Sequence, residues 1–202
     1  MDRINIVVSC TAGKYLPSEH REYDRYKGDP ERWLADADNM NEKYKMRADE
    51  LYKGPGADKF RAIKEMIEDE GYAVDLWILS AGFGLIKGDT MLPGYDATFS
   101  SMAKFNRVRP ADYDTWLGGV TRQELPEDSL ILLPNSYLKP FKVLVDPDDH
   151  YQFGPFGGEA REMIGCSMIR VQLEASYKII EYGLANDIPA AKWCDIPLEQ
   201  VL

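Results

Sequence analysis

The chain has 202 residues, of which 45% are hydrophobic and 29% charged, and its formal net charge is −10. These values are typical of one globular domain. No apolar run is long enough to span a bilayer, and the N-terminus does not resemble a signal peptide, so we expect a cytoplasmic protein. Three cysteines and two histidines argue against a disulfide framework and a structural zinc site. The negative net charge disfavours a general attraction to nucleic acid but does not exclude a local basic groove.

The first predicted strand covers residues 4–9, which are almost continuously apolar, as the strands of a parallel sheet are. Cys10 and Lys14 follow it, and in α/β sheets ligands bind in the loops at the carboxyl ends of strands. Gly13 leaves backbone N–H groups free to meet an anion, so Lys14 is a candidate anion-binding residue, or else a solvated lysine. Cys10 is a candidate substrate-binding residue, although a cysteine at a strand end more often serves only in packing.

Residues 15–29 are polar, rich in tyrosine and arginine and weakly periodic, so we expect a loop or lid. Pro30, preceded by a capping aspartate, is typical of a helix start, and apolar residues at helical spacing predict one helix over residues 30–51. A second helix is predicted over residues 57–70 and a buried strand over 73–79. This strand–helix–helix–strand order indicates a parallel sheet.

Two turns rich in glycine follow the second predicted strand. Ser80, Phe83 and Gly84 lie in the first, and Tyr95 and Asp96 end the second, Pro-Gly-Tyr-Asp. Glycine permits a positive φ and a close approach of backbone to ligand, so Ser80, Phe83 and Gly84 are candidate substrate-binding residues. The alternative is a turn that only packs its aromatic side chain into the core. Asp96 is likewise either a functional carboxylate or a turn residue bonded to its own backbone.

Residues 101–109 form the one locally basic stretch that also contains an aromatic side chain. Arg107 is our candidate there for contact with a phosphate group. The alternative is an ordinary solvated loop. A short helix is predicted over the following residues, 110–120.

A third buried strand is predicted over residues 130–133, and Asn135 and Tyr137 follow its end. If the strands are parallel, these two residues lie on the same sheet edge as residues 9–14, which include Cys10 and Lys14, and residues 80–86, which begin with Ser80. Amide and phenol groups are suited to contact a base edge or a sugar hydroxyl. We therefore expect Asn135 and Tyr137 to belong to a polar pocket at this edge.

The last part of the chain contains a glycine cluster at residues 154–158, followed by Arg161. Paired glycines before a helix leave N–H donors free, so this segment is a candidate phosphate or carboxylate cradle to which Arg161 adds a forked hydrogen bond. A fourth strand is predicted over residues 168–172, a closing helix over 173–185 and an irregular tail over 187–202. The elements together indicate one α/β domain for the whole chain, built on a central, mostly parallel sheet of four or five strands flanked by helices.

Several motifs in the first half of the chain occur in one order: Ile6-Val7-Val8-Ser9-Cys10, Lys14, Ala48-Asp49-Glu50-Leu51-Tyr52, Phe60, Ile78-Leu79-Ser80-Ala81, Phe83-Gly84-Leu85-Ile86, Pro93 and Tyr95-Asp96-Ala97-Thr98-Phe99. This order resembles the YaaA-like superfamily and a related set of small bacterial and phage proteins. Phe83 stands where the family usually has tyrosine, and Lys14 follows Cys10 at a looser spacing than in the compact Cys-Ser-x-x-Lys form. The resemblance implies work on nucleic acid, and parts of the superfamily are similar to enzymes that act on the N-glycosidic bond of modified bases.

From this resemblance we expect a DNA glycosylase-like enzyme that cleaves or exchanges the N-glycosidic bond of a base, such as a modified base in phage or bacterial DNA. The departing base leaves positive charge on the sugar, which calls for a carboxylate, and Asp96 is the candidate. Tyr95 and Asn135 complete the expected catalytic set. Asn135 and Tyr137 would hold the base, and Phe83 would stack on it once it is flipped out.

The expected partner is nucleic acid, DNA rather than RNA, or a nucleotide, with Lys14 or Arg161 binding a phosphate. No cofactor, metal or membrane is expected. Glu159 is the reserve carboxylate. Two alternatives stay open: a non-catalytic nucleic-acid-binding stress-response protein fits the resemblance equally well, and a small-nucleotide hydrolase or transferase suits the acidic surface better than a duplex substrate does.

Overall fold

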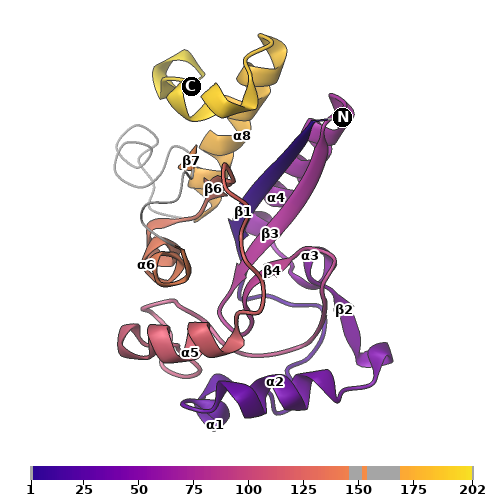
Figure 1. Cartoon of the computed structure of the whole chain (residues 1–202), viewed down its shortest axis with the longest axis vertical. Helices are drawn as coiled ribbons and strands as arrows, with labels where there is room; N and C mark the ends of the chain where they lie inside the picture. The colour runs from indigo at the N-terminus through magenta and orange to yellow at the C-terminus, as the bar shows by residue number, and fades with distance from the viewer. Residues whose placement is uncertain (1, 146–151, 154–168, 202) are drawn as a thin grey trace.

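A computed structural model of the chain describes residues 2–145, 152–153 and 169–201. The strands of its central sheet are β1 (Arg3–Ser9), β3 (Ala73–Ser80), β4 (Gly84–Lys87), β6 (Leu130–Leu132) and β7 (Gln152–Phe153). Their spatial order is β4-β3-β1-β6-β7, with β4 antiparallel to β3 and the other neighbours parallel (Figure 1). The expected α/β fold with a mostly parallel sheet is therefore confirmed.

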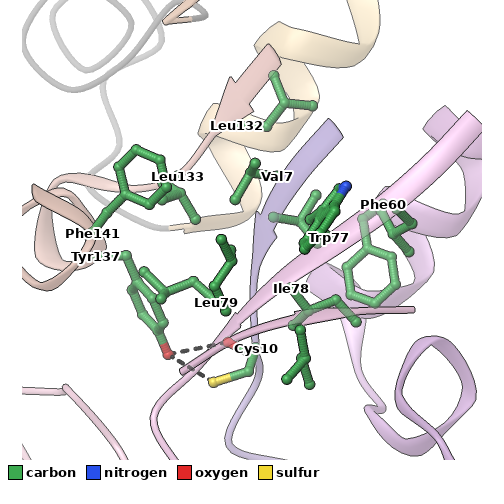
Figure 2. Packing of buried hydrophobic residues seen from close by; sticks show 14 of the residues in the cluster. Val7, Cys10, Phe60, Trp77, Ile78, Leu79, Leu132, Leu133, Tyr137 and Phe141 are labelled. Carbon is green, nitrogen blue, oxygen red and sulfur yellow. Dashed lines mark hydrogen bonds between the residues drawn. The ribbon is translucent and has the colours of Figure 1, made fainter. Parts of the chain in front are cut away.

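Two long helices cover one face of this sheet. α4 (Pro55–Asp69) packs against β3, α8 (Ile169–Ala185) packs against β6, and the two helices pack against each other (Figure 1). Phe60, Ile63 and Ile67 of α4 share one face at three- and four-residue spacing, and all three are buried. Figure 2 shows part of the core that forms between this layer and the sheet.

A second group of helices lies where β1 and β3 end. α2 (Pro30–Asp38) packs against α5 (Tyr113–Val120), which in turn packs against α6 (Asn135–Leu144) and β4 (Figure 1). Trp33 of α2 is fully buried and lies edge-on to Trp116 of α5, with 5.4 Å between ring centroids. Of the helices that the structure describes, none is both long and apolar enough to cross a membrane.

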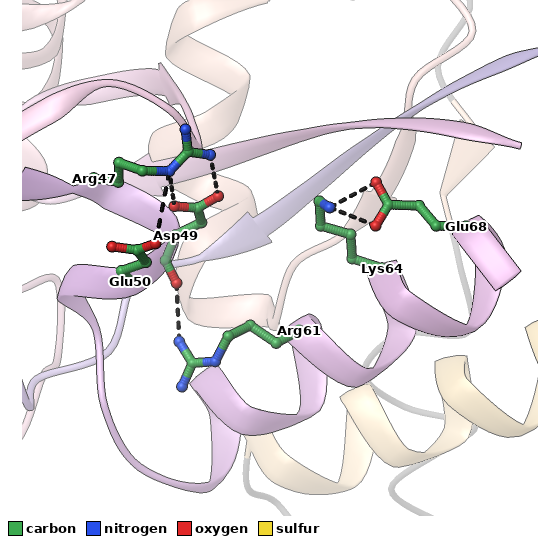
Figure 3. Close-up of polar contacts among 6 residues, drawn as sticks. All are labelled: Arg47, Asp49, Glu50, Arg61, Lys64 and Glu68. Carbon is green, nitrogen blue, oxygen red and sulfur yellow. Dashed lines mark hydrogen bonds and ion pairs between the residues drawn. The ribbon is translucent and has the colours of Figure 1, made fainter.

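A two-stranded antiparallel ribbon, β2 (Lys45–Arg47) with β5 (Met91–Pro93), stands outside the main sheet. Figure 3 shows the polar contacts that tie it to α4. Arg61 donates to the backbone oxygen of Asp49 at 2.9 Å, and Arg47 donates two hydrogen bonds, of 3.1 and 2.8 Å, to the carboxylate of Asp49. The remaining short elements are α1 (Tyr23–Tyr26), η1 (Glu42–Tyr44), α3 (Ala48–Leu51), η2 (Pro110–Asp112), η3 (Ala190–Asp195) and η4 (Leu198–Gln200).

β4 forms one edge of the main sheet, and on the side that faces away from β3, side chains rather than another strand bond to its backbone. Thr121 Oγ1 accepts a hydrogen bond from Leu85 N at 3.4 Å, and Gln123 Oε1 accepts one from Lys87 N at 3.0 Å. Gly84 has a φ of +63°, and a Cβ atom there would overlap the Thr121 side chain. Gly84, expected to bind substrate, thus serves the packing of this edge.

The single helix predicted over residues 30–51 is wrong, because residues 39–47 interrupt it and only α2 and α3 at its two ends are α-helical. α2 ends at its cap residue, Asn39, and the side chain of Asn41 then accepts a hydrogen bond from Lys43 N at 3.1 Å to start the 3₁₀ turn η1. β2 follows and pairs with β5, which the sequence pattern does not predict. Short side-chain caps and pairing with a distant segment therefore override the helical spacing of the apolar residues.

The other elements are mostly as predicted: the strands over 4–9, 73–79 and 130–133 and the helices over 57–70, 110–120 and 173–185 are confirmed. The strand predicted over 168–172 is wrong, because α8 already begins at Ile169. The tail from residue 187 is not irregular but forms η3 and η4. Trp193 of η3 is buried and donates to the backbone oxygen of Ile188 within the tail at 2.9 Å. η3 packs against α8, where a Cβ atom at Gly183 would overlap the Trp193 ring, so the tail is packed against the domain.

Candidate functional site

The carboxyl ends of β1, β3 and β6 meet at one rim of the sheet, and three of the predicted site residues lie there. Cys10 directly follows β1, Ser80 ends β3, and Tyr137 lies in the first turn of α6, just after β6. The hydroxyl of Tyr137 donates to the backbone oxygen of Cys10 at 3.1 Å and lies 3.3 Å from its Sγ atom (Figure 2). Cys10 is only 2% exposed, so Cys10 and Tyr137 form a buried layer beneath this edge of the sheet, here called the floor of the site.

A network of buried hydroxyl groups continues this floor. The hydroxyl of Tyr95 lies 2.8 Å from Ser80 Oγ and 2.8 Å from the hydroxyl of Tyr52. Ser80 Oγ also accepts hydrogen bonds from the backbone N–H groups of Gly82 and Phe83, at 3.2 and 3.0 Å. Burial raises the pKa of Tyr95 and of Tyr52 well above the ordinary value, and this effect outweighs the hydrogen bonds with Ser80 that lower both pKa values. These phenols therefore stay protonated and serve as hydrogen-bonding groups rather than bases.

Lys14 lies on top of this network. Its Nζ atom is 4.0 Å from the ring centroid of Tyr95 and 5.7 Å from that of Tyr52, and it donates to the backbone oxygen of Thr11 at 3.4 Å. No carboxylate among the described residues forms an ion pair with it. Burial lowers the pKa of Lys14, whereas electrostatic interactions with Cys10 and Asp96 oppose that change. The site thus contains a recessed cation close to two groups that can carry negative charge.

Glycines allow the chain to bring Lys14 so close to Tyr95. A Cβ atom at Gly82 would lie 2.7 Å from ring atoms of Tyr95, and one at Gly94 would overlap the backbone oxygens of residues 16–17. Lys14 is also held by its backbone, because it forms a β-bridge with Tyr52. The position of the lysine is therefore set by main-chain pairing with the segment around Tyr52.

The lowered pKa of Lys14 predicts how stability depends on pH. Between the lowered pKa and the ordinary lysine value of 10.5, the unfolded chain binds more protons than the folded one, so folding becomes more favourable as pH rises. Lys14→Met removes this cost. We expect the variant to be more stable than wild type near neutral pH and the difference to shrink as pH rises toward the onset of tyrosine ionisation near about 10.

Urea unfolding at a series of pH values measures this difference. Lys43→Met is the matched control, because it removes a lysine that lies 4.7 Å from the ring of Tyr44 but on the exposed surface. A difference between wild type and Lys14→Met that stays constant over the whole pH range would contradict the assignment.

Asp96 lies beside this site with its side chain exposed. The backbone pairs with the preceding loop, since Asp96 N donates to Arg21 O at 2.8 Å and Tyr23 N donates to Asp96 O at 2.9 Å. Consecutive side chains of such an extended segment point to opposite sides, so Tyr95 points inward and Asp96 outward. Asn106 Nδ2 donates to the Asp96 carboxylate at 2.8 Å. The carboxylate is thus oriented and open to solvent.

Burial corrects several predicted roles. Cys10, Ser80 and Tyr137 were expected to bind substrate, but they are at most 6% exposed and bond to partners inside the protein, so they support the site from below. Phe83 is 5% exposed and packs against Trp33 and Tyr95, with centroids 5.6 and 5.2 Å away, so its ring is a core side chain and does not stack on a flipped base. The hydroxyl of Tyr95 is fully engaged with Ser80 and Tyr52, so Tyr95 supports Lys14 with its ring instead of acting on substrate.

The remaining candidates stand as follows. Arg107 is half-buried, and its Nε atom has no hydrogen-bond partner among the described residues. Burial raises the pKa of the nearby Tyr113, and the positive charge of Arg107 partly offsets this increase. Asn135 starts α6 at the rim, but its side chain is outside the described structure. Arg161, Glu159 and the glycine cluster at 154–158 also lie outside the described residues.

Two residues of the site were not predicted: Tyr52, which stands in the Ala48–Tyr52 motif without an assigned role, and Asn106, which gives no sequence signal beyond its basic surroundings. Among the residues that the structure describes, no group of three or more histidine, cysteine, aspartate or glutamate side chains is placed to hold a metal ion. Comparisons of the sequence with protein-family models and with curated proteins find no match.

Proposed function

We propose that the protein is a DNA glycosylase-like enzyme, which cleaves or exchanges the N-glycosidic bond of a nucleic-acid base. The observation that carries the proposal is a half-buried lysine, Lys14, placed over the ring of Tyr95, whose chain neighbour Asp96 is an exposed and oriented carboxylate. Both belong to the region where three parallel strands end. This edge of an α/β sheet is the usual place for a ligand. The resemblance of the motifs around Lys14 and Asp96 to the YaaA-like superfamily supports the same class of reaction.

The two groups match the charges that develop when a glycosidic bond breaks. The bond between C1′ of the sugar and the base nitrogen breaks, its electron pair leaves with the base, and C1′ becomes positive. Asp96 stabilises the positive sugar and accepts a proton from the water whose oxygen forms the new bond to C1′. Asp96 then returns this proton to solvent, and the released base takes one up from solvent. Lys14, as an ammonium group, compensates the negative charge on the leaving base or on a neighbouring phosphate. Asn135 holds the base, and Tyr137 keeps the floor at Cys10 in place.

Base release tests this proposal directly. The protein is incubated with DNA that carries modified bases and with unmodified DNA, released bases are identified by mass spectrometry, and alkali-labile sites are counted on the same DNA. We expect free base and abasic sites in equal amounts on at least one modified DNA. If no modified DNA yields either product, the glycosylase proposal is wrong.

A second candidate substrate is a free nucleotide, which would make the protein a small-nucleotide hydrolase or transferase. The net charge of −10 favours it, because an acidic surface repels a long polyanion more than a single nucleotide. DNA affinity measured at several salt concentrations separates the two: a slope near zero together with turnover of free nucleotides would support the nucleotide. A cytoplasmic location belongs to either proposal and is supported by the small number of cysteines, of which Cys10 and Cys194 are free.

A further inference from the structure

One loop beside the candidate site exposes large apolar side chains. Met102 is 90% exposed and Phe105 is 74% exposed, and both lie in residues 100–105, here named the 100–105 loop. Its ends are closed by backbone pairing, because Thr98 N donates to Asn106 O and Val108 N donates to Thr98 O, each at 2.9 Å. The loop therefore projects from a fixed base, with its apolar side chains at the surface.

The base of the 100–105 loop is tied to the candidate catalytic carboxylate. Asn106 has a left-handed φ of +54°, and its side chain donates to Asp96 at 2.8 Å. Its backbone N–H donates to the Asp24 carboxylate at 3.0 Å, and Asp24 N donates back to Asn106 Oδ1 at 3.2 Å. This arrangement sets the base of the 100–105 loop beside Asp96.

The segment that contains the loop has a charge opposite to that of the protein as a whole, although the carboxylates of Asp24 and Asp96 lie at its base. Residues 100–109 contain Lys104, Arg107 and Arg109 and no acidic residue, in a chain of net charge −10. Within the part of the chain that the structure describes, none of these three cations forms an ion pair. Exposed apolar side chains beside cations without ion-pair partners are complementary to nucleic acid, because the apolar groups can stack on bases and the cations can contact phosphates.

We propose that the 100–105 loop is a wedge that enters the base stack of DNA, with Phe105 and Met102 between bases and the three cations on the flanking phosphates. Side chains of this kind insert between base steps and unstack them. An enzyme that acts on a base must take it out of the stack, and a wedge beside Asp96 does so at the point of reaction. The inference rests on the proposed function and specifies its substrate as a polynucleotide rather than a free nucleotide.

The double variant Phe105→Ala with Met102→Ala tests the wedge, and its folding is not at risk because both side chains are exposed. Binding is followed by fluorescence anisotropy on short single-stranded and duplex DNA, and unstacking by the fluorescence of a 2-aminopurine base within them. We expect affinity to fall about 10- to 100-fold and the rise in 2-aminopurine fluorescence to disappear. Tyr44→Ala, which removes another exposed aromatic ring, is the matched control and should leave both unchanged.

The outcomes separate this inference from the proposed function. If wild type releases base but the double variant binds, unstacks and releases as well as wild type, the wedge is wrong and the glycosylase proposal stands. If wild type binds and unstacks DNA through this loop but releases no base, the wedge stands and the reaction is wrong. If wild type does not bind DNA at all, the wedge is wrong.

Discussion

Replacing Asp96 with asparagine is expected to reduce the rate of base release by a factor of about 10² to 10⁴, the range found when a catalytic acid or base or a charge-stabilising group is removed. The substitution keeps the size of the side chain and an oxygen that can accept the hydrogen bond from Asn106. It removes only the negative charge and the basic oxygen. Single-turnover release of base from modified DNA measures the effect, because it reports the chemical step apart from product release.

Asp24→Asn is the matched control for this experiment. Asp24 is also exposed and also bonds to Asn106, through the backbone N–H at 3.0 Å, so its amide variant removes one negative charge from the same neighbourhood. Asp24→Asn is expected to retain base release within a few-fold of wild type. Equal activity of Asp96→Asn and wild type would remove the role assigned to Asp96, and equal losses in both variants would indicate a general effect of charge.

The largest effect on stability is expected for Trp33→Ala, at about 3–5 kcal/mol of unfolding free energy. Trp33 is fully buried, and its ring contacts those of Tyr26, Phe83, Tyr95 and Trp116 at centroid distances of 5.3, 5.6, 6.1 and 5.4 Å. Truncation leaves a cavity where α2, α5 and the turn after β3 meet, and aromatic cores collapse poorly around such a space. Urea unfolding monitored by circular dichroism measures the loss.

Trp33→Phe distinguishes ring packing from hydrogen bonding at this position. Nε1 of Trp33 is buried without a hydrogen-bond partner among the described residues, so phenylalanine keeps a ring and removes an unpaired donor. We expect this variant to lose only about 1–2 kcal/mol. Tyr44→Ala, at the exposed surface, is the control and should change stability by less than about 0.5 kcal/mol. Equal losses for the alanine and phenylalanine variants would contradict the packing explanation.

The central sheet could be predicted because its strands carry their signal locally. Residues 4–9 and 73–79 are nearly continuous apolar runs, which is what strands covered by neighbours on both sides require, and they pair in parallel throughout. β2 and β5 have only three residues each, and they are strands because they pair with each other across a long separation in sequence. Their apolar residues also fit a helix. Local secondary-structure propensity therefore does not determine these two strands; their pairing with each other does.

Part of the candidate site could be predicted for a related reason. Parallel strands bring their carboxyl ends to one edge, so Cys10, Ser80 and Tyr137 were expected together and lie together. The direction of each side chain could not be predicted. Tyr95 and Asp96 are neighbours in sequence, yet one is buried and the other exposed, because pairing with residues 21–23 makes this segment extended. Residues 21–23 have no periodic pattern of their own, so this pairing could not be predicted from the sequence.

The side-chain caps on β4 have a consequence for the protein in concentrated solution. An uncapped edge strand offers a row of amide groups onto which a strand of another molecule can add, and such addition is a route to fibrils. Here Thr121 and Gln123 already accept the hydrogen bonds of Leu85 and Lys87, so an incoming strand must first displace the segment that carries them. The cost of that displacement protects this side of the sheet from growth between molecules.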